Sequence, residues 1–148
     1  MSSRSILVAI LCLFAGSTIG AGAYVFYYSE GYAYLSNNPQ ACINCHAMQD
    51  AFDGWQKSSH HPIATCNSCH ASGNFIQKYY GKALNGFMHS YAFTMGYKEP
   101  IQIKDFNRQV TERSCRGCHS DFIQSSHFNS SPETSCVRCH SQVGHLRK

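Results

Sequence analysis

The sequence lacks the patterns expected of a nucleic-acid-binding protein, because its 148 residues contain no run of Lys or Arg and no base-stacking motif. It also lacks charge over one long stretch, Ile6 to Tyr28, which reads ILVAILCLFAGSTIGAGAYVFYY. An apolar run of this length can cross a hydrocarbon core roughly 30 Å thick. The remaining chain is short and polar and can bury only a modest protein core. We therefore expect cofactors or cross-links to stabilise it.

The apolar run has two interpretations. Arg4, the apolar stretch and Ala21-Gly22-Ala23 fit a cleaved secretory signal. The run continues past that cleavage site, however, and ends among tyrosines typical of an aromatic belt at a membrane surface: Tyr24, Tyr27, Tyr28, Tyr32 and Tyr34. These two features favour a retained single-pass anchor over residues 1–28. The positive-inside rule then predicts a cytoplasmic N-terminus and an exported domain, residues 29–148, in the periplasm.

Eight of the nine cysteines form four Cys-x-x-Cys-His motifs. This pattern places two thiols one helical turn apart, where they form thioethers with haem, and delivers the next His to the iron. Structural zinc and disulfides are the competing explanations, but neither explains why His follows the second Cys in every pair. The sequence therefore predicts four covalent c-type haems. The attachment residues are Cys42, Cys45, Cys66, Cys69, Cys115, Cys118, Cys136 and Cys139, and the adjacent histidines are His46, His70, His119 and His140.

The motifs fall into two similar halves, about 29–73 and 98–148. Trp55-Gln-Lys-Ser-Ser-His60 separates the motifs of the first half, and Phe122-Ile-Gln-Ser-Ser-His127 separates those of the second. Such self-similarity suggests duplication of a two-haem unit. It favours His60 and His127 as distal iron ligands over the neighbouring candidate His61. His145 follows His140 too closely to serve the same haem, which makes it a candidate ligand for a haem of the other half.

Residues 74–97 join the halves and carry no haem motif. Apolar residues from Phe75 to Tyr91 recur at i, i+3/i+4 spacing, which predicts an amphipathic helix. Its aromatic face suits either packing against haems or a position at the membrane interface. The opposite stripe carries Lys78, Lys82, Asn85 and His89. The expected fold class is mainly α with much irregular loop: one transmembrane helix and a small multihaem domain built around four haems.

The order of these features resembles the NrfH/NapC family of membrane-anchored tetrahaem quinol dehydrogenases, and its NrfH branch in particular. The similarity covers nearly the whole chain, from YxxGYxYLSxxPxxCxNCHxM through three further CxxCH motifs. The resemblance implies oxidation of menaquinol at the outer face of the cytoplasmic membrane and electron transfer to a periplasmic multihaem reductase. For the NrfH branch, that partner is the pentahaem cytochrome c nitrite reductase, which makes ammonium. A homodimer within a larger complex stays open. Gly16 and Gly20 form a G-x-x-x-G pair suited to helix packing, but small residues are common in membrane helices, so the pair does not favour dimerisation by this face.

The resemblance also implies roles for three residues. Met48, rather than His46, ligates the first haem, whose other side faces the quinol pocket; on the residues alone, packing against the porphyrin is the simplest role for Met48. Lys82 matches the lysine of that pocket. His89 stands where the family has an aspartate, and a His there either accepts the quinol proton near neutral pH or binds the open iron.

Two other classes of function fit the same motifs. One is a tethered or soluble tetrahaem electron carrier without quinol chemistry. The other is a substrate-reducing enzyme that works alone and needs an open iron exposed to water. The chain is small for an enclosed catalytic pocket, and only the first haem is a candidate for an open iron, so the sequence favours the quinol dehydrogenase.

Overall fold

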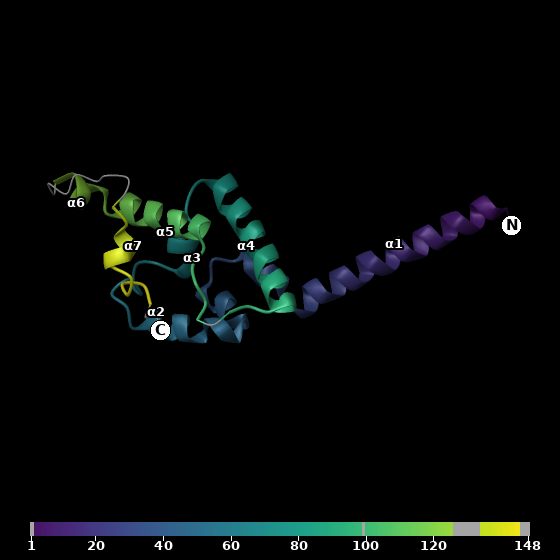
Figure 1. Cartoon of the computed structure of the whole chain (residues 1–148), viewed down its shortest axis with the longest axis horizontal. Coiled ribbons are helices and arrows are strands. Elements are labelled where there is room, and N and C mark those ends of the chain that lie inside the picture. The colour runs from purple at the N-terminus through teal and green to yellow at the C-terminus, as the bar shows by residue number, and fades with distance from the viewer. Residues whose placement is uncertain (1, 99, 126–133, 146–148) are drawn as a thin grey trace. The chain divides into compact units, whose positions relative to one another are not determined.

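The computed structural model describes residues 2–98, 100–125 and 134–145, and every regular element within them is helical, which confirms the predicted fold class. Figure 1 shows these elements along the chain. They are α1 (Ser3–Tyr28), the 3-10 helices η1 (Gly31–Leu35), η2 (Pro39–Asn44) and η3 (His46–Met48), α2 (Gln49–Gln56), α3 (Cys66–His70), α4 (Phe75–Met95), α5 (Asp105–Cys118), α6 (Ser120–Ser125) and α7 (Cys136–Cys139).

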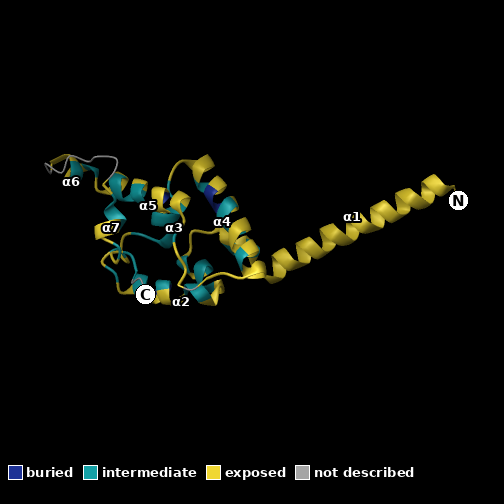
Figure 2. Cartoon of the chain, in the orientation of Figure 1, coloured by how far each residue is buried: buried dark blue, intermediate teal, exposed yellow. Residues whose placement is uncertain are grey.

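The chain divides into two compact units, Met1–Ser36 and Asn37–Lys148. The first consists mainly of α1, whose N-cap Ser2 accepts a hydrogen bond from the backbone N–H of Ser5. All of α1 is exposed (Figure 2), and the helix is long and apolar enough to cross a membrane. A cleaved signal has the same length and composition, so α1 alone does not decide between the two interpretations. The expected division at residue 28 stays a prediction.

A tight turn follows α1 and places Gly31 close to the Phe26 ring. Glu30 adopts a left-handed backbone conformation with φ of 53°. A Cβ atom on Gly31 would lie 2.5 Å from Cδ2 of Phe26, far inside van der Waals contact. A side chain at position 31 would therefore force the exposed Phe26 ring to move.

The second unit has almost no core made of protein. Among the described residues, Phe52, Ala71 and Val110 are the only buried hydrophobic side chains, and no large side chain is fully buried. A self-sufficient domain of this length buries a much larger apolar core. Its helices therefore depend on something other than their own side chains, as expected of a chain built around large prosthetic groups.

The helix α4 lies within the stretch where periodicity predicts one. Asn74 and Gln77 form a reciprocal capping box at its start, so two backbone donors of the first turn are satisfied. Gly96, with φ of 90°, follows its last residue. The helix is thus one residue shorter at its start and two at its end than the predicted range of 74–97.

The polar stripe of α4, rather than its aromatic stripe, faces the rest of the unit. Lys82 is only 5% exposed, and the side chain of Asn85 accepts a hydrogen bond from Asn107 of α5 at 3.0 Å. By contrast, the aromatic side chains Phe75, Phe87 and Phe93 are 76%, 67% and 81% exposed. The aromatic stripe is therefore not covered by the described protein.

The helix α5 connects three parts of the unit and contacts both α3 and α7 (Figure 1). The hydroxyl of Ser114 donates to the carbonyl oxygen of Cys69 in α3 at 3.0 Å. One turn before Cys115, Glu112 accepts hydrogen bonds from the first residues of α7. Acidic Asp105 in the first turn and basic Arg116 in the last turn favour this helix through its dipole.

Candidate haem and redox sites

Three of the Cys-x-x-Cys-His motifs share one local geometry. Each places its two cysteines on the same α-helical turn, in α3, at the end of α5 and in α7. His70 is the last residue of α3, while His119 and His140 are the C-caps of α5 and α7. Residues three apart on a helix are neighbours on its surface, so each pair of thiols lies beside the histidine that follows it.

The first motif differs from the other three. Cys42 belongs to η2, whereas Cys45 is extended, with φ of −99° and ψ of 115°, and separates η2 from η3. The one-turn arrangement that the sequence predicts for every motif is therefore interrupted here. His46 consequently begins a separate helical turn and is exposed, while Met48 at the end of that turn is half-buried.

The thiols are available for covalent attachment, because all nine cysteines are free. Within the part of the chain that the structure describes, no group of three or more His, Cys, Asp or Glu side chains gathers to hold a metal ion. Free thiol pairs, each followed by a histidine, in a unit with almost no protein core match the requirements of haem c.

Motifs that follow one another in the sequence are also neighbours in space. The thiols of Cys42 and Cys66 are hydrogen bonded, which lowers the pKa of Cys42 and raises that of Cys66. Burial raises the pKa of Cys69, and the nearby Cys118 of the third motif adds to this increase. Burial likewise raises the pKa of Cys115 to about 11, with Cys136 of the fourth motif contributing. Each of the four attachment sites therefore lies next to the one that precedes it in the sequence.

Two pairs of histidines are separated as the axial ligands of one haem would be. The ring centroids of His60 and His119 are 6.2 Å apart, and those of His70 and His145 are 6.1 Å apart. A metal ion bonded to two opposed imidazoles, at about 2 Å from each nitrogen, holds their ring centroids roughly 6 Å apart. Each pair contains one motif histidine and one histidine from outside the motifs.

Neighbouring groups orient His60 and its loop. The Nδ1 atom of His60 lies 3.2 Å from the carbonyl oxygen of Val143, a contact that leaves Nε2 for a metal. The indole nitrogen of Trp55 donates to the carbonyl oxygen of Ala64 at 2.8 Å and closes the loop that carries this histidine. The ring of His61 instead lies against Trp55, with ring centroids 4.5 Å apart.

The environment of His70 favours a neutral imidazole. Burial lowers the pKa of His70, and the nearby His145 lowers it further. Metal ions bind neutral imidazole, so the same surroundings that disfavour the imidazolium favour His70 as an iron ligand.

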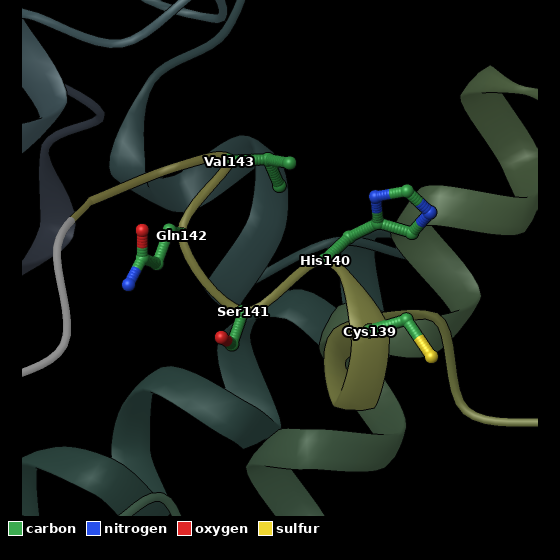
Figure 3. A pocket seen from close by; sticks show the side chains of 5 residues that line it. All are labelled: Cys139, His140, Ser141, Gln142 and Val143. Carbon is green, nitrogen blue, oxygen red and sulfur yellow. The ribbon is translucent and has the colours of Figure 1, made fainter.

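The fourth motif adjoins an open surface pocket of about 430 Å³, which is lined by residues 139–143. Figure 3 shows the Cys139 and His140 side chains projecting to one side of this segment, away from Gln142. The predicted ligand His127 lies outside the described residues, so its role stays a prediction.

Lys82 is the one buried polar or charged residue in the described ranges, and it lies near the first motif. Its Nζ atom donates to the Oδ1 atom of Asn37 at 3.4 Å and stands 5.8 Å from the centroid of the Tyr79 ring. Burial and the positive charge of Lys78 lower the pKa of Lys82, while the Cys42 thiol acts in the opposite direction. The buried amine is therefore a hydrogen-bond donor beside the first haem motif.

His89 lies two turns after Lys82, about 10 Å along the same stripe of α4. Its side chain is largely exposed. Partial desolvation lowers the pKa of His89, so that the neutral imidazole is the main form at pH 7. A neutral imidazole accepts a proton, which is the chemistry predicted for this position.

Three residues of the site went unnoticed in the sequence. The Oδ1 atom of Asn37 accepts hydrogen bonds from both Lys82 and Asn67, and thereby connects α4 to the second motif. Glu112 and Ser114 hold the neighbouring motifs against α5. Each acts on a partner at least 24 positions away in the sequence, and no local spacing marks such a contact.

The chain is similar to a known protein family and to two of its characterised members. The chain matches the NapC/NirT cytochrome c family, N-terminal region, over residues 2–148. The cytochrome c-type protein NrfH of Wolinella succinogenes is 35% identical, and the alignment covers 97% of this chain and 88% of that protein. The cytochrome c nitrite reductase subunit NrfH of Nitratidesulfovibrio vulgaris is 27% identical, with 98% and 89% covered.

A solved structure is also similar. It is the crystal structure of the cytochrome c nitrite reductase NrfHA complex bound to the HQNO inhibitor, in which one chain superimposes with a TM-score of 0.67 at 25% identity. The match covers 92% of the chain described above and 91% of the solved chain.

Proposed function

The chain belongs to the NapC/NirT cytochrome c family and binds haem c covalently, and from this we propose that it is a menaquinol dehydrogenase. It oxidises menaquinol from the membrane and passes the electrons through four c-type haems to a periplasmic reductase. Similarity to two NrfH proteins and to the NrfHA complex supports the pentahaem cytochrome c nitrite reductase as that partner.

The observation that carries the proposal is the buried position of Lys82 beside Cys42 of the first motif. The Nζ atom of Lys82 donates to Asn37, and an ammonium group carries three N–H donors in total. A quinol oxygen is a suitable acceptor for its Nζ atom, and the HQNO inhibitor bound in the related complex is a quinone analogue. His89, on the same stripe, accepts a quinol proton. The protons leave to the periplasm, while haem, when bound, takes up the electrons one at a time.

We assign the iron ligands as follows. His70 and His145 would hold one haem iron and His119 and His60 another, because the rings of each pair lie about 6 Å apart. Met48 is the ligand of the first haem in place of His46, supported by the extended Cys45 that interrupts this motif. His140 binds the fourth haem, and His127 is its candidate partner within the chain.

We further propose that α1 is a retained anchor in the cytoplasmic membrane, with Arg4 and the short N-terminal tail on the cytoplasmic side and the haem domain in the periplasm. Its length and apolar composition support a membrane span. Arg4 near the start of α1 supports this orientation through the positive-inside rule.

The test is an anaerobic visible spectrum of the detergent-purified protein before and after addition of a reduced menaquinol analogue. We expect rapid growth of the reduced c-type bands, blocked by HQNO. Bands that dithionite reduces but quinol does not would instead indicate a passive electron carrier. Addition of purified nitrite reductase and nitrite then tests the partner, since quinol-dependent formation of ammonium is expected.

A further inference from the structure

The start of α7 is held from a distance by one carboxylate. Glu112 of α5 accepts a hydrogen bond from the hydroxyl of Ser135, and further bonds from the backbone N–H groups of Cys136 at 2.8 Å and Val137 at 3.1 Å. A second contact reinforces this attachment, because the guanidinium of Arg116 donates to the carbonyl oxygen of Thr134 at 2.6 Å.

These contacts supply what α7 lacks by itself. The first N–H groups of a helix have no partners inside it, and a helix of four residues is far too short to be stable alone. A carboxylate at this end satisfies those donors and interacts favourably with the helix dipole. Burial opposes the ionisation of Glu112, but the three hydrogen bonds more than compensate and keep its pKa below the usual value.

We infer that Glu112 is a positioning residue for the haem of the fourth motif. It fixes the turn that carries Cys136 and Cys139 against α5, and it places a negative charge beside the point of haem attachment. The inference rests on the proposed attachment of a haem to this motif. A nearby negative charge stabilises the ferric over the ferrous state, so Glu112 lowers the reduction potential of this haem relative to the same site without the charge.

The variant Glu112→Gln keeps the size of the side chain and removes its charge. In an anaerobic redox titration of the full-length protein, we expect one midpoint potential to rise more than the others, with a smaller rise at the third motif, where the charge of Glu112 also acts on Cys115. Intact mass counts the haems in the same sample. Glu112→Asp, which retains the charge, is expected to return the potential toward the wild-type value.

The matched control is Asp105→Asn, which removes a carboxylate from the same helix. Asp105 is exposed and pairs with Arg108, one turn later. This variant is expected to leave every potential unchanged.

The outcomes separate the inference from the proposed function. Unchanged potentials in Glu112→Gln would overturn the inference, as would an equal rise in Glu112→Asp. If Glu112→Gln loses a haem, peptide mapping must place the empty site at Cys136 and Cys139, and loss at another motif would contradict the assignment. If the intact mass of the wild-type protein corresponds to fewer than four haems, the proposed haem count is wrong, whatever the variants show.

Discussion

At the scale of single residues, a buried lysine requires an explanation. Lys82 is 5% exposed and has Asn37 as a hydrogen-bond partner at 3.4 Å, a long contact for an ammonium group. The neighbouring Lys78 adds repulsion that lowers its pKa further. Such an environment costs stability, and proteins retain it where the group is needed for a ligand.

The first prediction concerns this amine. Lys82→Gln is expected to slow quinol oxidation by about ten- to a hundred-fold, because a hydrogen bond from a charged donor contributes roughly 1.5–3 kcal/mol. Stopped-flow reduction of the haem bands measures the rate, and intact mass checks that no haem is lost. Lys57→Gln, at an exposed lysine next to α2, serves as the control. A wild-type rate in Lys82→Gln would remove this residue from the mechanism.

A second residue-scale prediction concerns pH. Desolvation lowers the pKa of His89 below its ordinary value of 6.5, so this histidine is neutral above that lowered pKa and protonated below it. A protonated imidazole accepts no further proton. Quinol oxidation is therefore expected to fall as the pH decreases through the lowered pKa, in the range below 6.5. His89→Gln should slow the reaction and remove this acid limb; an unchanged limb would assign proton acceptance to another group.

At the scale of elements, α5 holds the motifs together. It carries the third motif. Its Glu112 side chain accepts a hydrogen bond from the backbone N–H of Cys136 at the start of α7, and its Ser114 hydroxyl donates one to the carbonyl oxygen of Cys69 in α3. Because α5 carries the third motif and contacts the second and fourth, it sets the distances between these three motifs. The geometry of three successive haem sites therefore depends on one regular element.

The third prediction tests this connection. Ser114→Ala removes the donor to the Cys69 carbonyl and is expected to lower the free energy of unfolding of the haem-loaded protein by about 1–3 kcal/mol. Thermal unfolding monitored by circular dichroism measures the effect. The control Ser125→Ala removes a hydroxyl whose bond among the described residues lies within its own helix, to Phe122, and should change stability much less.

Two elements differ from what their sequences indicate. The periodicity predicts α4, but it does not reveal that its polar stripe faces the unit while its aromatic stripe is exposed. The Cys-x-x-Cys spacing predicts one helical turn at every motif, yet Cys45 is extended. Both outcomes depend on neighbours elsewhere in the chain, which local periodicity does not encode.

At the scale of the whole molecule, the two halves exchange histidines. His60 of the first half stands opposite His119 of the second, and His145 of the second half stands opposite His70 of the first. The contact between His60 and the carbonyl oxygen of Val143 adds another bond between the halves. Neither half therefore brings both histidines of a pair together by itself.

The fourth prediction follows from this exchange. His145→Met is expected to change the axial ligation of the haem on the second motif, so that one low-spin bis-histidine signal disappears from the electron paramagnetic resonance spectrum. Its midpoint potential should rise, because a thioether favours ferrous iron. His61→Asn is the control, since the His61 ring lies against Trp55. Loss of the same signal in His61→Asn, and not in His145→Met, would reverse the assignment.

The sequence alone indicates the class of this protein, its helical character and its candidate haem attachment points, and the resemblance to a known family adds Lys82 and His89 as catalytic candidates. These features are local, because thioether chemistry needs two thiols and a histidine within one short segment, and a span needs one uninterrupted apolar run. The tertiary structure decides which histidines face each other, which stripe of α4 turns inward, and that Asn37 and Glu112 contact the site. Those contacts join residues far apart in the chain, and their geometry arises only when the whole chain packs around the sites that its motifs create.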